Sequence, residues 1–551
     1  MHEEGYKKRL ADLLAMDFNR RAFLKGVALT GFSVVGGSVF GTDFVRPSPA
    51  MAQAAAKRGG TLRVAWLSSV DFLDPHYTAV TAGVQMCGNI YNGLLKITYD
   101  GKRVEFKPDL AETWEMPNDR THVFHLHKGV KFHDGSECDA SVIKWNLERV
   151  KAKESASPHA WKLALLDNIE VLDKHTVRLN YSKPYAFFPV AMNGTTGRAG
   201  TVVSRQAVEK FGKAIARNPV GTGPFKFVEW VENDRIVIAR FPDYFEKGLP
   251  YLDRVEAKLM TEASSAVAAI ITGEIDGLTT IPFQFAKQLR ANPKINVYTQ
   301  VGGNYLFLGM NCAKPPFNDL KLRQAVSFCI DRKAVIDQLL FGEGIPAHGP
   351  ISPPMSDFFE PDWSKGNNGQ YFDLDKAKAL MRESKYPNGV ECDYVAAATY
   401  TGELAGAQRN AEILQGMLAK IGVKANIKPF ERAAYRKTLI DGNFNLFDYY
   451  WAFDLDPDET IYPELHSGES WNWGKWNNPE FDKLVEDARV TLDVKKRKEY
   501  YGKANRLVAD QAPYALIAHV NEFKVFGKHV KNFNPIPAEL VNLGDVWIDK
   551  G

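Results

Sequence analysis

The chain has 551 residues, 45% of them hydrophobic and 25% charged. Because domains usually run to about 100–200 residues, this length predicts two or three packed units rather than one simple core. The 69 basic and 66 acidic residues give a formal charge of +3, and no block of like charge stands out beyond the N-terminal segment. This balance argues against nucleic acid as a partner.

Residues 1–54 are predicted to be a twin-arginine-type signal peptide. An arginine pair precedes a weakly apolar stretch over 26–40, and cleavage is expected after Ala52 or Ala54. The stretch is shorter than the ~20 residues that span a bilayer, and no lipobox cysteine follows it. We therefore expect a freely diffusing periplasmic protein without stable membrane insertion. The motif residues are Arg20, Arg21, Phe23 and Leu24.

Elements of both kinds follow in the first half of the remaining chain. In order, we expect a strand at 61–66, a helix at 83–95, a strand at 121–127, a helix at 142–150, strands at 173–180, 223–227 and 235–241, and a helix at 263–271. Ser141 or Asp139 is available as N-cap of the second helix, and Gly273 ends the third.

The second half continues this alternation. In order, we expect a strand at 305–310, helices at 321–342, 375–382 and 403–421, a strand at 423–427, a largely helical stretch at 481–512, and strands at 514–520 and 522–526. Strands that alternate with helices throughout indicate an α/β protein with mixed sheets. The paired glycines Gly302 and Gly303 divide the chain into similar halves and suit a hinge.

The five cysteines stand far apart, without a C-x-x-C pair or a zinc-type spacing, so a metal–thiolate site is not expected. The odd number leaves at least one thiol unpaired, and one disulfide stays open in an oxidising compartment. They are Cys87, Cys138, Cys312, Cys329 and Cys392.

Seven colinear segments carry a family resemblance over essentially the whole chain after residue 54. They are Gly59–Val64, Leu73–Pro75, Pro108–Trp114, Phe124–Gly135, Pro219–Phe225, Asn311–Phe317 and Leu322–Ala325. In this order they resemble the peptide, nickel and opine class of extracellular solute-binding proteins, also called family 5.

The resemblance implies a two-lobed periplasmic-binding-protein clamshell, class II-like, with mixed sheets and an extra inserted domain. Domain I would comprise 57–91, 217–303 and 521–551, domain II 92–216 and domain III 304–520. A ligand would be enclosed between the lobes, and the closed form would be recognised by the permease of an ABC importer, which has a cytoplasmic ATPase. We expect a monomer that is not an enzyme and needs no cofactor.

The segment 449–458 places aromatic residues beside three carboxylates. By its spacing from Trp451, Asp454 matches the family aspartate that holds a peptide's free amino group, and Asp456 could exchange roles with it. Trp451 offers a flat wall for a ligand. The alternatives are an N-cap or a solvated acidic turn for the aspartates and core packing for Trp451.

Further ligand-binding candidates flank the expected cleft. His76 and Tyr77 follow the first strand, and Asn304 and Tyr305 lie beside the paired glycines; a loop or structural role is the alternative for each. Thr401 stands where dipeptide binders carry an arginine that clamps the peptide carboxylate. This departure weakens a dipeptide assignment and leaves longer peptides, or ligands without a carboxylate, open.

The chain carries few motifs that would favour a metal site or an enzyme. His125 and His127 share one face of a strand and His122 the other, so only two would converge and no metal site is expected. The chain has no G-x-S-x-G, H-E-x-x-H or P-loop motif, which makes an exported hydrolase the less favoured reading. A peptide-like ligand is preferred; a nickel chelate, an opine or an oligosaccharide, or a chaperone-like role, stays open because a fold does not fix its ligand.

Overall fold

The computed structural model describes residues 56–195, 198–360, 369–398, 407–451, 455–538 and 540–549. The predicted signal peptide and the candidates Thr401 and Asp454 lie outside these ranges. None of the helices within them is long and apolar enough to cross a bilayer.

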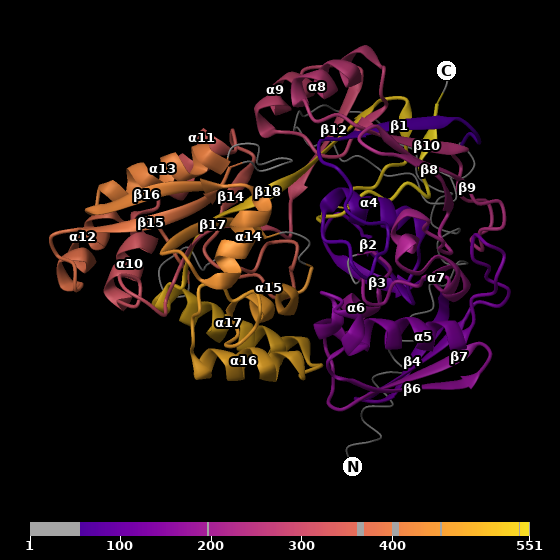
Figure 1. The fold of residues 1–551 in the computed structure, drawn as a ribbon, viewed down its shortest axis with the longest axis horizontal. Coiled ribbons are helices and arrows are strands. Elements are labelled where there is room, and N and C mark those ends of the chain that lie inside the picture. Colours follow the sequence, from indigo (N-terminus) through magenta and orange to yellow (C-terminus); the bar gives the residue numbers. More distant parts are fainter. Residues whose placement is uncertain are drawn as a thin grey trace, which may run out of the picture. The chain divides into compact units, whose positions relative to one another are not determined.

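One mixed sheet runs through most of the described chain (Figure 1). Its strands are β1 (Thr61–Trp66), β8 (Phe225–Val231), β9 (Arg235–Arg240), β10 (Arg254–Leu259), β11 (Gly277–Leu278), β12 (Ile295–Val301), β13 (Tyr305–Met310), β14 (Gly344–Pro346), β15 (Val390–Ala397), β16 (Val423–Phe430), β17 (Leu446–Trp451) and β18 (Tyr514–Gly527). The order is β16-β15-β17-β13-β18-β11-β1-β10-β9-β8, and β12 and β14 also pair with β18. The predicted strands 61–66 and 305–310 are confirmed in both bounds.

The strand β18 joins the two halves of this sheet. Its first half pairs with β13 and β14, and its second half pairs with β11 and β12. The prediction of two strands, 514–520 and 522–526, was wrong, because the strand does not break at Asn521. Asn521 instead pairs with Val301 in the ladder and donates its side-chain amide to Glu343 at 3.0 Å, so the strand continues.

A second, antiparallel sheet has the order β4-β5-β7-β6. Its strands, with the hairpin β2–β3 and two small strands near the C-terminus, are β2 (Leu95–Tyr99), β3 (Val104–Pro108), β4 (Ala111–Asn118), β5 (Thr121–Leu126), β6 (Leu166–Asp173), β7 (Thr176–Tyr181), β19 (Val530–Lys531) and β20 (Trp547–Ile548). The strand predicted over 173–180 is present as β7, but it begins at Thr176, because Asp173 accepts a hydrogen bond from the His175 amide at 2.7 Å and closes a turn between β6 and β7.

Helices flank both sheets. They are α4 (Thr81–Ile90), α5 (Ala140–Lys151), α6 (Phe188–Met192), α7 (Arg205–Phe211), α8 (Ala263–Thr272), α9 (Ala286–Arg290), α10 (Leu320–Cys329), α11 (Arg332–Leu339), α12 (Leu374–Glu383), α13 (Ala407–Ala419), α14 (Arg432–Asp441), α15 (Pro457–Leu465), α16 (Pro479–Arg489) and α17 (Val494–Gln511), with 3₁₀ turns η1 (Lys153–Ser155), η2 (Ala160–Leu163), η3 (Gly212–Arg217) and η4 (Phe283–Phe285). Asp139 is the N-cap of α5, and Gly273 ends α8 with φ 81°.

Two predicted helices, 321–342 and 83–95, were too long. The stretch 321–342 divides into α10 and α11 because Asp331 accepts a hydrogen bond from the Ala334 amide at 3.0 Å and caps a new helix. The largely helical stretch predicted over 481–512 is confirmed as α16 and α17, and Asp493 separates them by capping α17. The helix predicted to Leu95 ends at Ile90, and Leu95 begins β2.

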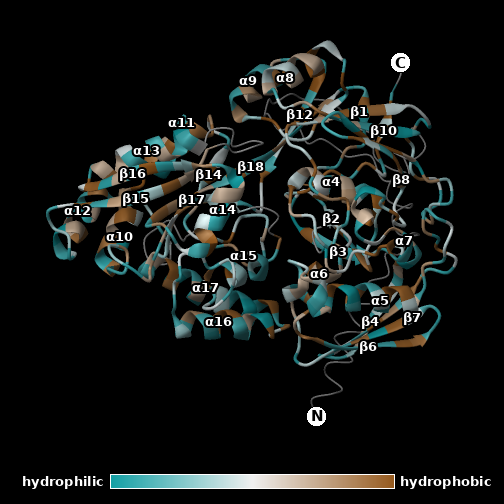
Figure 2. Cartoon of the chain, viewed as in Figure 1, coloured by the Kyte–Doolittle hydropathy of each residue, from teal (hydrophilic) through white to brown (hydrophobic). Residues whose placement is uncertain are grey.

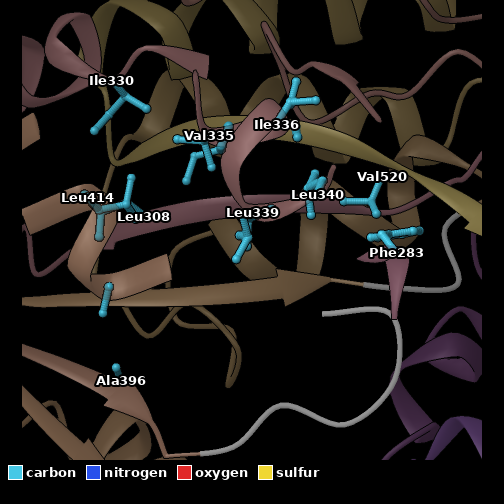
Figure 3. Packing of buried hydrophobic residues seen from close by; sticks show 14 of the residues in the cluster. Phe283, Leu308, Ile330, Val335, Ile336, Leu339, Leu340, Ala396, Leu414 and Val520 are labelled. Carbon is cyan, nitrogen blue, oxygen red and sulfur yellow. The ribbon is translucent and has the colours of Figure 1, made fainter. Parts of the chain in front are cut away.

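The largest apolar core lies between the main sheet and helices α10, α11 and α13. Figure 3 shows Leu308 of the sheet among Val335, Ile336 and Leu339 of α11 and Leu414 of α13. In contrast, α16 and α17 carry mostly hydrophilic residues on the face seen in Figure 2, and their buried positions, such as Phe481 and Val485, join a separate aromatic core. Amphipathic helices on a mixed sheet confirm the predicted α/β class.

Gly302 lies in a tight space between β12 and β13. A Cβ atom there would lie 2.4 Å from the side-chain amide nitrogen of Asn304 and 3.0 Å from the Val520 carbonyl oxygen, so a larger residue would require the Asn304 side chain to move. The amide of Gly302 donates to Val520 O at 3.0 Å, and that of Gly303 to Pro537 O at 2.8 Å. The hinge role of this pair and the three-domain division both stay predictions.

All five cysteines are free thiols, four of them buried and Cys312 half-buried. Burial raises the pKa of each, to about 12 for Cys329 and Cys392 and to about 11 for Cys312. They behave as small hydrophobic residues of the core.

Candidate functional site

Three parallel strands end at one edge of the main sheet. The register pairs Ala397 of β15 with Phe430 of β16, and Val395 of β15 with Phe447 of β17, so the carboxyl ends of all three strands lie together. Helix α14 begins directly after β16, and α15 follows β17. Open α/β sheets bind ligands outside the carboxyl ends of their strands, where helix N-termini also add a positive field. We call this region the carboxyl edge.

Four aromatic rings gather at the carboxyl edge. Trp451, the last residue of β17, meets Trp471 edge to face with ring centroids 4.9 Å apart, and Trp471 lies 5.2 Å from Trp473. Tyr449 meets Trp473 at 4.9 Å. Trp473 is buried, whereas Trp451, Trp471 and Tyr449 are half-buried. Such rings present rigid, flat apolar walls at a low cost in side-chain entropy.

Two arginines of α14 border these rings. The Arg436 guanidinium lies over the Trp471 ring, 5.1 Å from its centroid. Burial raises the pKa of the Tyr449 phenol, and the positive charges of Arg432 and Arg436 act in the opposite direction, so both cations lie within electrostatic range of that ring. Both arginines are exposed, and within the described residues neither is paired with a carboxylate.

Beside this edge, the first turn of α15 carries a buried ionic cluster. Asp456 is the N-cap of the helix, its side chain accepting a hydrogen bond from the Asp458 amide at 2.9 Å. It also accepts a bidentate pair of hydrogen bonds from the Arg497 guanidinium at 2.6 and 2.7 Å. Asp458 accepts from Arg489 at 2.8 Å. Buried ion pairs of this kind hold their elements in place, because removing one partner leaves the other charge buried without a counter-ion.

The third acid of that turn, Glu459, binds the fully buried Lys162 of η2. The segment around η2 also braces the loop that follows β1, since the Ser157 hydroxyl donates to the His76 carbonyl at 2.8 Å and a His159 ring nitrogen lies 3.2 Å from the Thr78 carbonyl. One segment thus links this loop to α15.

The predicted site residues divide into two groups. Trp451 lies at the carboxyl edge, and the register places Tyr305 directly opposite it on β13. Tyr305 is buried and donates its hydroxyl to Glu464. Asn304 is also buried, accepting from the Val520 amide at 2.9 Å and donating to Glu522 at 3.2 Å. Asp456 is engaged by Arg497 as described, so these three polar groups all make contacts within the fold, and a ligand contact for any of them stays a prediction.

The candidates His76 and Tyr77 lie in the loop after β1, far in sequence from the strands of the carboxyl edge. His76 is buried, with one ring nitrogen 2.8 Å from the Thr201 carbonyl and the other 2.7 Å from Arg149. Burial lowers the pKa of His76 to about 4. Arg149 is paired with Asp74 at 2.6 Å and lies over the half-buried Tyr77 ring at 5.4 Å. A ligand contact for His76 or Tyr77 stays a prediction.

The sequence interpretation missed Arg432, Arg436 and Trp471. An arginine pair four residues apart, directly after a strand, was the available signal. In β5, His122 is buried on one face and His125 is half-buried on the other, as the strand period predicts. Among the described residues no three His, Cys, Asp or Glu side chains could hold a metal ion.

Comparisons with known proteins give this geometry a context. The family described as "Bacterial extracellular solute-binding proteins, family 5 Middle" matches residues 105–473. Glutathione-binding protein GsiB of Pectobacterium atrosepticum is 27% identical over 87% of this chain and 92% of its own. Heme-binding protein A of Haemophilus influenzae is 30% identical over 82% and 86%.

A solved structure extends the likeness to the fold. The ABC transporter-associated periplasmic binding protein DppA from Helicobacter pylori, in complex with peptide STSA, superposes with a TM-score of 0.78 at 26% identity, covering 90% of this chain and 99% of its own. The two-lobed clamshell predicted from the sequence is thereby confirmed, and with it a ligand-binding role. The chain belongs to family 5 of the bacterial extracellular solute-binding proteins, the substrate-binding components of ABC importers.

Proposed function

We propose that the chain captures a peptide-like small molecule at the carboxyl edge and delivers it to the permease of an ABC importer. The observation that carries the proposal is the pair of half-buried tryptophans, Trp451 and Trp471, held edge to face at the ends of parallel strands. The buried ionic cluster of α15 fixes the chain next to them, so the walls are organised before a solute arrives. The relatives named for glutathione and for a bound peptide favour a peptide-like solute.

Asp454 is proposed to receive the amino group of that solute. It lies between Trp451 and the first turn of α15 in the sequence. Asp456 is the weaker candidate, because Arg497 already occupies both of its carboxylate oxygens. A charge-assisted hydrogen bond to an ammonium group contributes about 1.5–3 kcal/mol.

We further propose that the protein works in the periplasm after removal of residues 1–54. The arginine pair, the weak apolar stretch and the sites after Ala52 and Ala54 support export. N-terminal sequencing of the exported protein should give a chain that begins at Gln53 or Ala55. A full-length chain retained in the cytoplasm would contradict this part of the proposal.

The solute can be identified directly. Small molecules released from the denatured, purified protein are analysed by mass spectrometry, and a peptide mixture is then titrated against stripped protein while its Tm is followed. We expect peptides to be released unchanged and to raise Tm. Asp454→Ala should lose most of that rise, whereas Asp243→Ala on an exposed turn should keep it.

Other outcomes separate the alternatives. Recovery of a nickel chelate, an opine or an oligosaccharide would overturn the peptide-like assignment and leave the importer role in place. Hydrolysis of the added peptides during the titration would instead favour an exported hydrolase.

A further inference from the structure

The two arginines of α14 differ from the other described cations near the carboxyl edge. Lys162, Arg489 and Arg497 are each buried against a carboxylate. Arg432 and Arg436 are exposed, and within the described ranges the one contact recorded for their guanidinium groups is that of Arg436 with the Trp471 ring. A guanidinium over an aromatic face keeps its donors free around its rim, which suits a planar anion.

Helix α14 is fixed in a way that presents both arginines together. Tyr435 and Leu439 are buried on its inner side, and the Tyr435 hydroxyl donates to the Asp448 carbonyl of β17. The helix packs on β15 and β16 (Figure 1). Arg432 and Arg436, four residues apart, therefore share one exposed face at the end of α14 that meets the carboxyl edge.

Among the described residues, no nearby acid forms an ion pair with Arg432 or Arg436. Asp441 is engaged by Lys437 at 2.6 Å. Glu464 is fully buried, and burial raises its pKa well above the ordinary range even though the Tyr305 hydroxyl opposes the shift, so it favours the neutral form. Glu431 precedes the helix but forms no side-chain cap hydrogen bond. The N-terminus of α14 adds a positive field beside the two guanidinium groups.

We infer that Arg432 and Arg436 receive a carboxylate of the captured solute while Trp471 and Trp451 hold its apolar part. This inference rests on the proposed function and assigns the solute class: a small peptide with a free carboxylate rather than an uncharged or cationic one. Thr401 stands where dipeptide binders carry the arginine that binds the peptide carboxylate. In this chain the carboxylate-binding arginines would come instead from α14, which follows the next strand, β16.

The test uses two probes, a mixed tripeptide library with free C-terminal carboxylates and the same library as C-terminal amides. Affinity for each is measured by calorimetry on the full mature chain. The intact protein should bind the acids at least about tenfold more tightly than the amides, the effect expected for a lost charge-assisted pair. In Arg432→Gln/Arg436→Gln the preference should disappear through weaker binding of the acids.

The matched control is Lys378→Gln/Arg382→Gln on α12, where two exposed cations are also four residues apart. It removes the same charge and should keep the tenfold preference. Equal binding of acids and amides by the intact protein, or an unchanged preference in the α14 variant, would overturn the inference while leaving peptide capture standing. Binding of neither library would contradict peptide capture itself and the inference with it.

Discussion

The buried ionic cluster of α15 and the arginine face of α14 lie at the same sheet edge and use charge in opposite ways. In the first, Asp456, Asp458 and Glu459 each meet one cation from a different element, and all six side chains are buried. In the second, Arg432 and Arg436 are exposed beside half-buried tryptophans and are not matched by an acid among the described residues.

This contrast separates charged groups that stabilise the fold from charged groups that are available to bind a ligand. A buried charge must be paired because desolvation of an unpaired one is costly, so the α15 cluster is committed to the fold. An exposed guanidinium costs little without a partner and can exchange water for a ligand anion.

His122 is a third case, because it is buried while neither ring nitrogen has a hydrogen-bond partner among the described residues.

The largest expected effect comes from breaking the matched cluster. Arg497→Ala leaves Asp456 buried without its cation and should lower the free energy of unfolding by about 3–5 kcal/mol. Urea denaturation measures it. The control Lys498→Ala removes a partly exposed partner of Glu360, 3.0 Å away, and should cost no more than about 1 kcal/mol. Equal losses in the two variants would contradict the distinction.

A smaller effect should follow pH at His122. Burial lowers the pKa of its ring to about 4, so the folded protein keeps it neutral. Because the unfolded imidazole takes up a proton near its ordinary pKa of about 6.5, lowering the pH from there to about 4 stabilises the unfolded chain by about 3 kcal/mol at this position.

His122→Leu removes that titration. Relative to the natural chain, the variant should gain about 3 kcal/mol in unfolding free energy as pH falls from about 6.5 to 4, and no further below the folded pKa. Denaturation curves at several pH values check this. A constant difference between the two proteins across the range would show that His122 is solvated.

The smallest effect on stability is expected on α14. Arg432→Gln/Arg436→Gln should change the unfolding free energy of solute-free protein by no more than about 0.5 kcal/mol, as for other exposed positions. Thermal unfolding of stripped protein measures it. A loss of several kcal/mol would mean that the pair supports the fold and would remove the contrast with the α15 cluster.

Much of the fold was predictable because local patterns and tertiary structure agree. The alternation of β1 and the continuous apolar run of β13 agree with their bounds, and Gly273 ended α8 as expected. The errors came from local interactions that hydrophobic periodicity does not register. Asp331 starts a new helix inside an unbroken apolar pattern, and β18 continues through Asn521 because its partner strands change there.

The site was less predictable than the fold. Trp451 was found through its family segment, whereas Arg432 and Arg436 look like any solvated helix face in the sequence. Their meaning depends on Trp471, which lies far along the chain and is brought to Arg436 by folding. Asp456 was predicted to be a ligand group because the sequence does not show that folding pairs it with Arg497, which is also remote in sequence.

The most direct test of the carboxyl edge is the amount of small molecule that stays bound through purification, measured by mass spectrometry. Trp451→Ala/Trp471→Ala is compared with Trp145→Ala/Trp230→Ala, which removes two half-buried tryptophans that also lie under arginines, Arg205 and Arg217. Capture at the edge predicts that the first variant folds but loses the solute while the second keeps it. A folded Trp451→Ala/Trp471→Ala protein with the full complement of solute would contradict the account.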